Sequence, residues 1–141
     1  MPVLKRSETT SIDLGLAQLW ADRLGLQEWT IYLDSDMSAK EGGDTEDAET
    51  QAATSPLASY REATIRAGAT YPTEPGDREL TIVHELCHIL LADLARAAEV
   101  TVEAAPKGAR EALLQQAEDA QELTVVRLSR ALFVLLAKDP A

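Results

Sequence analysis

The sequence predicts an α+β domain in which a small sheet packs on an N-terminal helix, a central helix and a long C-terminal helix. Two observations support this class. The strand patterns are separated along the chain from the long helical patterns, in the order helix, strand, acidic segment, strand, helix, helix. The chain has 141 residues, a length that suits one hydrophobic core and not two. Residues 1–141 are therefore expected to form a single domain.

The N-terminal half supplies the first helix and both predicted strands. Apolar side chains recur at helical spacing over residues 11–24, and Gly25 is well placed to end that helix. Residues 28–33 alternate apolar and polar side chains and are rich in tryptophan and β-branched residues, which favours a strand. A second strand is expected over residues 59–67, where the same alternation returns.

An acidic segment at about residues 34–56 separates these strands and follows neither pattern. Its part from Asp36 to Pro56 holds six acidic residues and one lysine, a local charge of −5 out of −11 for the whole chain. A segment this polar buries too little apolar surface to offset the conformational entropy that it would lose on becoming ordered. We expect a mobile loop, either a solvated insertion, which is the more common case, or a lid over a site.

The C-terminal half is expected to be helical. Prolines and a glycine in residues 71–76 indicate a connection, and Asp77 is a good N-cap for a helix over residues 78–98. Pro106–Gly108 indicates the next turn, and a last helix is expected over residues 109–138. The apolar seam of that helix is formed by Leu114, Gln121, Val125, Leu128, Leu132 and Leu135.

Composition excludes several classes of partner. With 24 acidic and 13 basic side chains, the chain lacks the clustered cations that nucleic acids and anionic membranes require. The longest apolar run, Ala131–Ala137, is too short to cross a bilayer, and the N-terminus has no apolar stretch of signal-peptide length. One cysteine cannot form an internal disulfide, so a cytoplasmic location is expected.

A five-residue motif in the central helix carries the chemistry. The segment His84-Glu85-Leu86-Cys87-His88 contains both histidines of the chain. Residues four apart lie on the same face of a helix, so the two imidazoles can bind one ion while Glu85 lies beside them. This is the HExxH pattern of zinc peptidases, with two ligands and a general base. Chance placement of two histidines in this pattern is on the order of one in a thousand.

A third ligand must come from elsewhere, because catalytic zinc usually has three protein ligands and one open position. No histidine remains, and Cys87 is on the same helix, which can hardly supply three ligands tetrahedrally. Glu118 and Glu122 are one turn apart beside the apolar seam of the last helix, where an acid is costly unless it meets a cation. Glu122 directly precedes an apolar stretch and is expected to be the ligand, with Glu118 as the alternative.

With these residues the sequence resembles the gluzincin branch of zincin-like metallopeptidases, and most closely its minimal single-domain members, often encoded by phages and prophages. The resemblance extends over most of the chain, although only the His84–His88 motif is highly specific. It implies a zincin-like fold and a Zn²⁺ cofactor. It also implies that His84, His88 and Glu122 are the zinc ligands and that Glu85 is the catalytic base. Thermolysin-like relatives usually have an aspartate four residues after the ligand glutamate. Glu122 has Val126 at that place, whereas Glu118 has Glu122 there and matches the spacing better.

Peptide-bond hydrolysis is the expected reaction, with a peptide or protein as substrate. An extended peptide could pair with the strand near residues 63–67. Tyr60, Tyr71 and Arg78 are candidates to stabilise the oxyanion, and the sequence selects none of them.

Two alternatives to a peptidase stay open. One is a non-catalytic binding or regulatory module that zinc stabilises. The other is a helical protein that self-associates through the seam of its C-terminal helix.

Overall fold

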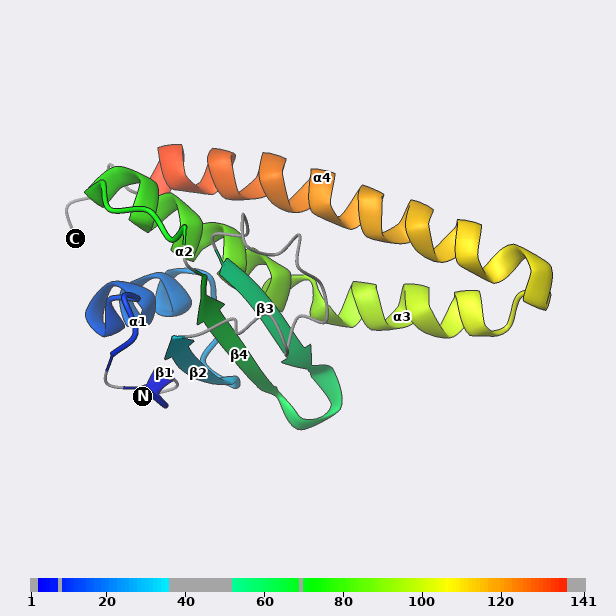
Figure 1. Cartoon of the computed structure of the whole chain (residues 1–141), viewed down its shortest axis with the longest axis horizontal. Coiled ribbons are helices and arrows are strands. Elements are labelled where there is room, and N and C mark those ends of the chain that lie inside the picture. Colours follow the sequence, from blue (N-terminus) through cyan, green and yellow to red (C-terminus); the bar gives the residue numbers. More distant parts are fainter. Residues whose placement is uncertain (1–2, 8, 36–51, 69, 137–141) are drawn as a thin grey trace.

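The computed structural model describes residues 3–7, 9–35, 52–68 and 70–136, and it confirms the α+β class (Figure 1). The elements are, in order, β1 (Val3–Lys5), α1 (Leu14–Arg23), β2 (Thr30–Ser35), β3 (Ala52–Leu57), a 3₁₀ turn (Ala58–Tyr60), β4 (Glu62–Ala67), α2 (Pro75–Leu90), α3 (Ala92–Glu103), a second 3₁₀ turn (Lys107–Ala109) and α4 (Arg110–Leu136).

Within the described residues the strands form one mixed sheet in the order β1-β2-β4-β3. β1 and β4 both run parallel to β2, whereas β3 runs antiparallel to β4. One face of the sheet carries the buried pairs of β2 and β4, in which Ile31 pairs with Ala63 and Leu33 pairs with Ile65. The register brings Thr54 of β3 to the same face, beside Ile65. A polar side chain on β3 therefore points toward the helices.

Local signals in the sequence set the ends of α1. The Asp13 side chain accepts a hydrogen bond from the Leu16 amide at 2.8 Å, which satisfies one of the free N–H groups of the first turn. After Leu24 the chain reaches Gly25 with a φ of +74°, a left-handed conformation that favours glycine. The predicted helix over residues 11–24 is thus confirmed, with its first turn starting at Leu14.

The segment 34–56, expected to be a loop, is in part regular structure. β2 extends to Ser35 and β3 already begins at Ala52, so the strand expectation for 59–67 missed β3 and included the 3₁₀ turn before β4. β3 consists of small and polar residues that give little hydrophobic signal, and the sheet holds it through backbone pairing with β4. Residues 36–51, most of the predicted loop, lie outside the described residues.

The helix expected over residues 78–98 is two helices. α2 begins earlier, with Glu74 at the N-cap and Pro75 in the first turn, so Asp77 lies inside the helix and not at its cap. α2 ends at Leu90 because Leu91 has φ −96° and ψ 9°, outside the helical region, and α3 starts one residue later. No glycine or proline marks this break.

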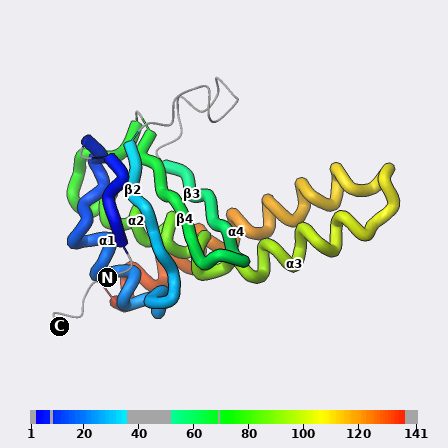
Figure 2. The backbone as a smooth tube through the Cα atoms, turned by 90° about the horizontal axis from the view of Figure 1, so that it is seen from below, coloured from blue at the N-terminus to red at the C-terminus, as the bar shows by residue number. Residues whose placement is uncertain are grey.

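α3 and α4 form a hairpin that extends away from the sheet (Figure 2). The C-terminal half of α4 returns along α2, where Val125 and Ser129 are buried and Phe133 stacks on Trp20 with ring centroids 6.1 Å apart. Of the predicted seam, Leu128 and Leu132 pack against the core, whereas Leu114 and Leu135 are exposed. Self-association through this helix stays a prediction. Among the described helices none combines the length and apolar character needed to span a membrane.

Candidate metal centre

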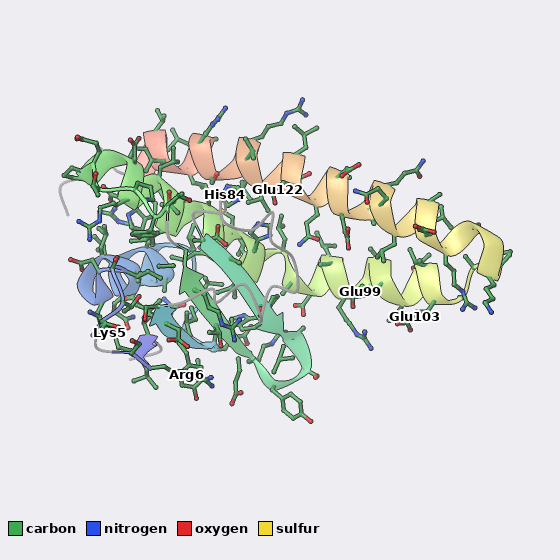
Figure 3. All side chains as sticks on the ribbon, in the orientation of Figure 1. Lys5, Arg6, His84, Glu99, Glu103 and Glu122 are labelled. Carbon is green, nitrogen blue, oxygen red and sulfur yellow. The ribbon has the colours of Figure 1, made fainter. Side chains whose placement is uncertain are left out.

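Three side chains from α2 and α4 converge on one point. His84 and His88 lie one turn apart on α2, with ring centroids 5.2 Å apart. Across from them, Glu122 of α4 has Oε1 at 2.9 Å from the Nε2 atom of His84 and Oε2 at 3.2 Å from the Nε2 atom of His88. Figure 3 shows His84 and Glu122 facing each other between the two helices. Residues 38 positions apart in sequence are thus neighbours in the fold.

The packing of α4 on α2 brings Glu122 to this point. Val125 and Ser129 are the buried residues of α4, and Glu122 precedes Val125 by three residues, so it lies on the same side of the helix one turn earlier. Glu118, one turn further away, lines the space between α3 and α4 and is outside the cluster. Cys87 is also outside it. Its thiol is buried, and burial raises its pKa to about 11.

The cluster fits a divalent metal ion. The ligand atoms of His84, His88 and Glu122 all lie within 4.8 Å of one another. Tetrahedral zinc ligands at about 2.0–2.1 Å from the ion are separated by roughly 3.4 Å. The measured 2.9 and 3.2 Å are close to that spacing, and a small rotation of Glu122, whose side chain is 55% exposed, widens them. Two imidazoles and one carboxylate are a donor set that zinc accepts, with a fourth position left for a water molecule.

Glu85 lies beside this cluster and is buried, with 6% of its surface exposed. Its Oε2 atom is 4.0 Å from the Nε2 atom of His84, and its Oε1 atom accepts a hydrogen bond of 2.7 Å from the Thr54 hydroxyl. Burial raises the pKa of Glu85, which the Thr54 hydrogen bond and the charges of His88 and His84 partly oppose. The result is a carboxylate that holds a proton more readily than an exposed glutamate does, as a proton-transferring group must.

Two hollows adjoin the cluster, one at each end of β3. The first, of about 340 Å³, is lined by Ala52, Leu80, Thr81, His84, Glu85, Val126, Ser129 and Arg130. The second, of about 300 Å³, is lined by Thr54, Pro56, Ala58, His88, Ala92, Ala95, Arg96, Glu99 and Gln121. Each hollow contains one histidine of the cluster, so a chain lying along β3 would pass the metal position. A more apolar hollow of about 370 Å³ between α3 and α4 contains neither histidine.

The structure revises other expectations about the site. β4 is an interior strand between β2 and β3, so residues 63–67 offer no free edge for a peptide, and β3 is the edge strand beside the site. Tyr60, Tyr71 and Arg78, the three candidates for the oxyanion, are absent from the described lining of both hollows. Tyr60 is exposed in the 3₁₀ turn that follows β3, and Arg78 donates a hydrogen bond to the Ser11 carbonyl.

Sequence reasoning missed Thr54 and Arg130. Thr54 is in the segment that was expected to be a loop, and only the strand register brings its hydroxyl to Glu85. Arg130 follows Glu122 by about two helical turns on α4, so the sequence indicates only that the two residues lie on the same side of that helix. The packing of α4 on α2 is what brings Arg130 into the hollow with His84 and Glu85.

Comparison of the chain with models of known protein families, with curated proteins and with solved structures finds no match.

Proposed function

We propose that this protein is a zinc-dependent peptidase, as its resemblance to the gluzincins implies. The observation that carries the proposal is the convergence of His84, His88 and Glu122 beside the buried Glu85. His84 and His88 come from one helical turn, and Glu122 comes from another helix, so the combination is not a consequence of the HExxH spacing alone. The net charge of −11 further supports a peptide and not a nucleic acid as the substrate.

The residues of the chain divide the reaction between them. Zinc held by His84, His88 and Glu122 would polarise the scissile carbonyl and lower the pKa of an attacking water. Glu85 accepts the proton of that water as the new C–O bond forms, and then delivers it to the leaving amine as the C–N bond breaks. Thr54 holds the Glu85 carboxylate in one orientation through its 2.7 Å hydrogen bond.

β3 is suited to align an extended peptide across the metal position. It is the edge strand on that side of the sheet, and the two hollows lie at its two ends. Pro56 has no N–H to donate, which an edge strand tolerates. A peptide running antiparallel to β3 would enter at the Pro56 end and leave at the Ala52 end, with its middle beside His84 and His88.

The burial of Glu85 favours catalysis over the alternative of a zinc-stabilised binding module. A buried carboxylate costs free energy unless its partners compensate for the loss of water. A purely structural zinc site gains nothing from an acid at this position, because Glu85 is not one of the three converging ligands.

The test combines metal analysis with peptide cleavage. Protein purified without chelator is expected to hold about one equivalent of zinc and to cleave members of a mixed peptide library, detected by mass spectrometry. Glu85→Gln is expected to keep the zinc and lose cleavage, whereas the matched Glu118→Gln variant keeps both. Less than a tenth of an equivalent of zinc per protein would contradict both the peptidase and the zinc-stabilised binding module. Undiminished cleavage by zinc-loaded Glu85→Gln would show that Glu85 is not the base.

A further inference from the structure

An arginine with no ion-pair partner among the described residues lines the first hollow next to the metal centre. Arg130 of α4 shares this hollow with His84 and Glu85, and it makes no ion pair or hydrogen bond within the part of the chain that the structure describes.

The second hollow differs in this respect. Its arginine, Arg96, is held by Glu99 at 3.2 Å, and both side chains line that hollow, so their charges cancel there. Each hollow thus contains one arginine and one glutamate, and the two ends of the site differ in whether the arginine is paired. Of the two arginines that line the hollows, only Arg130 makes no ion pair or hydrogen bond with another described residue.

We propose that Arg130 binds a carboxylate of the substrate on the C-terminal side of the scissile bond, an inference that rests on the proposed peptidase function. The guanidinium is a planar donor fork that matches a carboxylate in two parallel hydrogen bonds. A peptide antiparallel to β3 would place the residues that follow the scissile bond in the hollow that Arg130 lines.

The spacing of Arg130 and Glu122 along α4 indicates how far the substrate carboxylate lies from the scissile bond. Arg130 is eight residues after Glu122 on α4, about 12 Å along the helix axis at 1.5 Å per residue. An extended peptide advances about 3.3 Å per residue, and the long arginine side chain reaches back toward the site. The carboxylate is therefore expected roughly one to three residues after the scissile bond. It is either the free C-terminus of a short substrate or an acidic side chain, and both present the same group.

The test uses probes that bind zinc without being cleaved. Dipeptide hydroxamates with a free C-terminal carboxylate are compared with their C-terminal amides, and amide-capped probes ending in Glu are compared with probes ending in Gln. Binding is measured by calorimetry on zinc-loaded wild type, Arg130→Gln and Arg127→Gln. Arg127 is the matched control, because it is an exposed arginine on the same helix that lines neither hollow.

Wild type and Arg127→Gln are expected to bind a carboxylate probe roughly five- to twentyfold more tightly than its neutral partner, and Arg130→Gln about equally. Tighter binding of the free C-terminal carboxylate than of the C-terminal amide identifies the C-terminus as the group that Arg130 binds. Tighter binding of the probe ending in Glu than of the probe ending in Gln identifies an acidic side chain. Zinc-loaded wild type that shows no preference, or a preference that persists in Arg130→Gln, overturns the role of Arg130 and leaves the metal centre intact. Absence of zinc in wild type overturns the metal centre, and this inference with it.

Discussion

Replacing Thr54 by valine tests the contact that orients the proposed base. Thr54 donates its hydroxyl at 2.7 Å to the buried Glu85 carboxylate and lies 3.3 Å from the Glu85 carbonyl. Valine has nearly the same shape but no donor, so the variant leaves a buried carboxylate without this hydrogen bond. Thr54→Ser is the matched control because it keeps the hydroxyl.

The expected loss follows from the burial of Glu85. A hydrogen bond to a charged group contributes about 1.5–3 kcal/mol. The single Thr54 hydroxyl proton is shared between the Glu85 carboxylate and the Glu85 carbonyl, so we expect the lower end of that range. A loss of about 1.5 kcal/mol corresponds to a decrease of roughly 5 °C in Tm for a chain of this length, at about 2.1 cal/mol/K of unfolding entropy per residue. If the same energy is lost in the transition state, kcat/KM falls about tenfold.

Thermal unfolding at pH 8 and cleavage of a peptide that wild type hydrolyses measure the two effects. Thr54→Ser is expected to stay close to wild type in both, and zinc content to be unchanged in all three proteins. A Thr54→Val variant as stable and as active as wild type would refute the view that this hydrogen bond supports Glu85. The stability measurement remains informative for a protein without peptidase activity.

Three further predictions concern the metal ligands, a buried hydroxyl and the base itself. Glu122→Ala is expected to lose zinc, measured by metal analysis after dialysis, whereas Glu118→Ala retains it; the reverse result would exchange the two roles. Tyr71→Phe is expected to raise the free energy of unfolding by about 1 kcal/mol in urea titrations, because the Tyr71 hydroxyl is buried with no hydrogen-bond partner among the described residues. Burial also raises the pKa of Tyr71, which the nearby Arg78 guanidinium partly opposes, so wild type should lose stability relative to Tyr71→Phe as pH rises above about 10, the ordinary pKa of tyrosine; parallel pH profiles would contradict this. Zinc-free Glu85→Gln is expected to be more stable than zinc-free wild type by about 1 kcal/mol at pH 8, because it no longer buries a charge; lower stability would argue that Glu85 has a structural role.

Much of the site was predictable from local spacing. The proximity of the two histidines and Glu85 follows from helical periodicity, since α2 contains the whole motif and a helix brings residues four apart together. That Glu122 joins the two histidines was predictable because an acid next to an apolar seam needs a cation nearby. The choice between Glu122 and Glu118 depended on which turn of α4 meets α2, and that depends on tertiary packing.

The parts that escaped prediction are those held by long-range pairing. β1 and β3 are short or built from small residues, and they form strands because β2 and β4 supply hydrogen-bonding partners. The break at Leu91 has no glycine or proline to signal it, so the sequence pattern of one long helix continued through it. Thr54 could not be assigned a role without β3, because its contact with Glu85 depends on the register of that strand.

The arrangement of charges along β3 gives the proposed site a direction. At one end Arg96 is neutralised by Glu99, and at the other end Arg130 is unpaired within the described residues. Between them, Glu85 is kept from solvent and held by Thr54, so its charge is available to the reacting groups and not to bulk water. A substrate with a carboxylate near its C-terminal end would meet a complementary charge in only one of its two orientations along β3. That orientation is the antiparallel one, in which the residues after the scissile bond lie in the hollow that Arg130 lines.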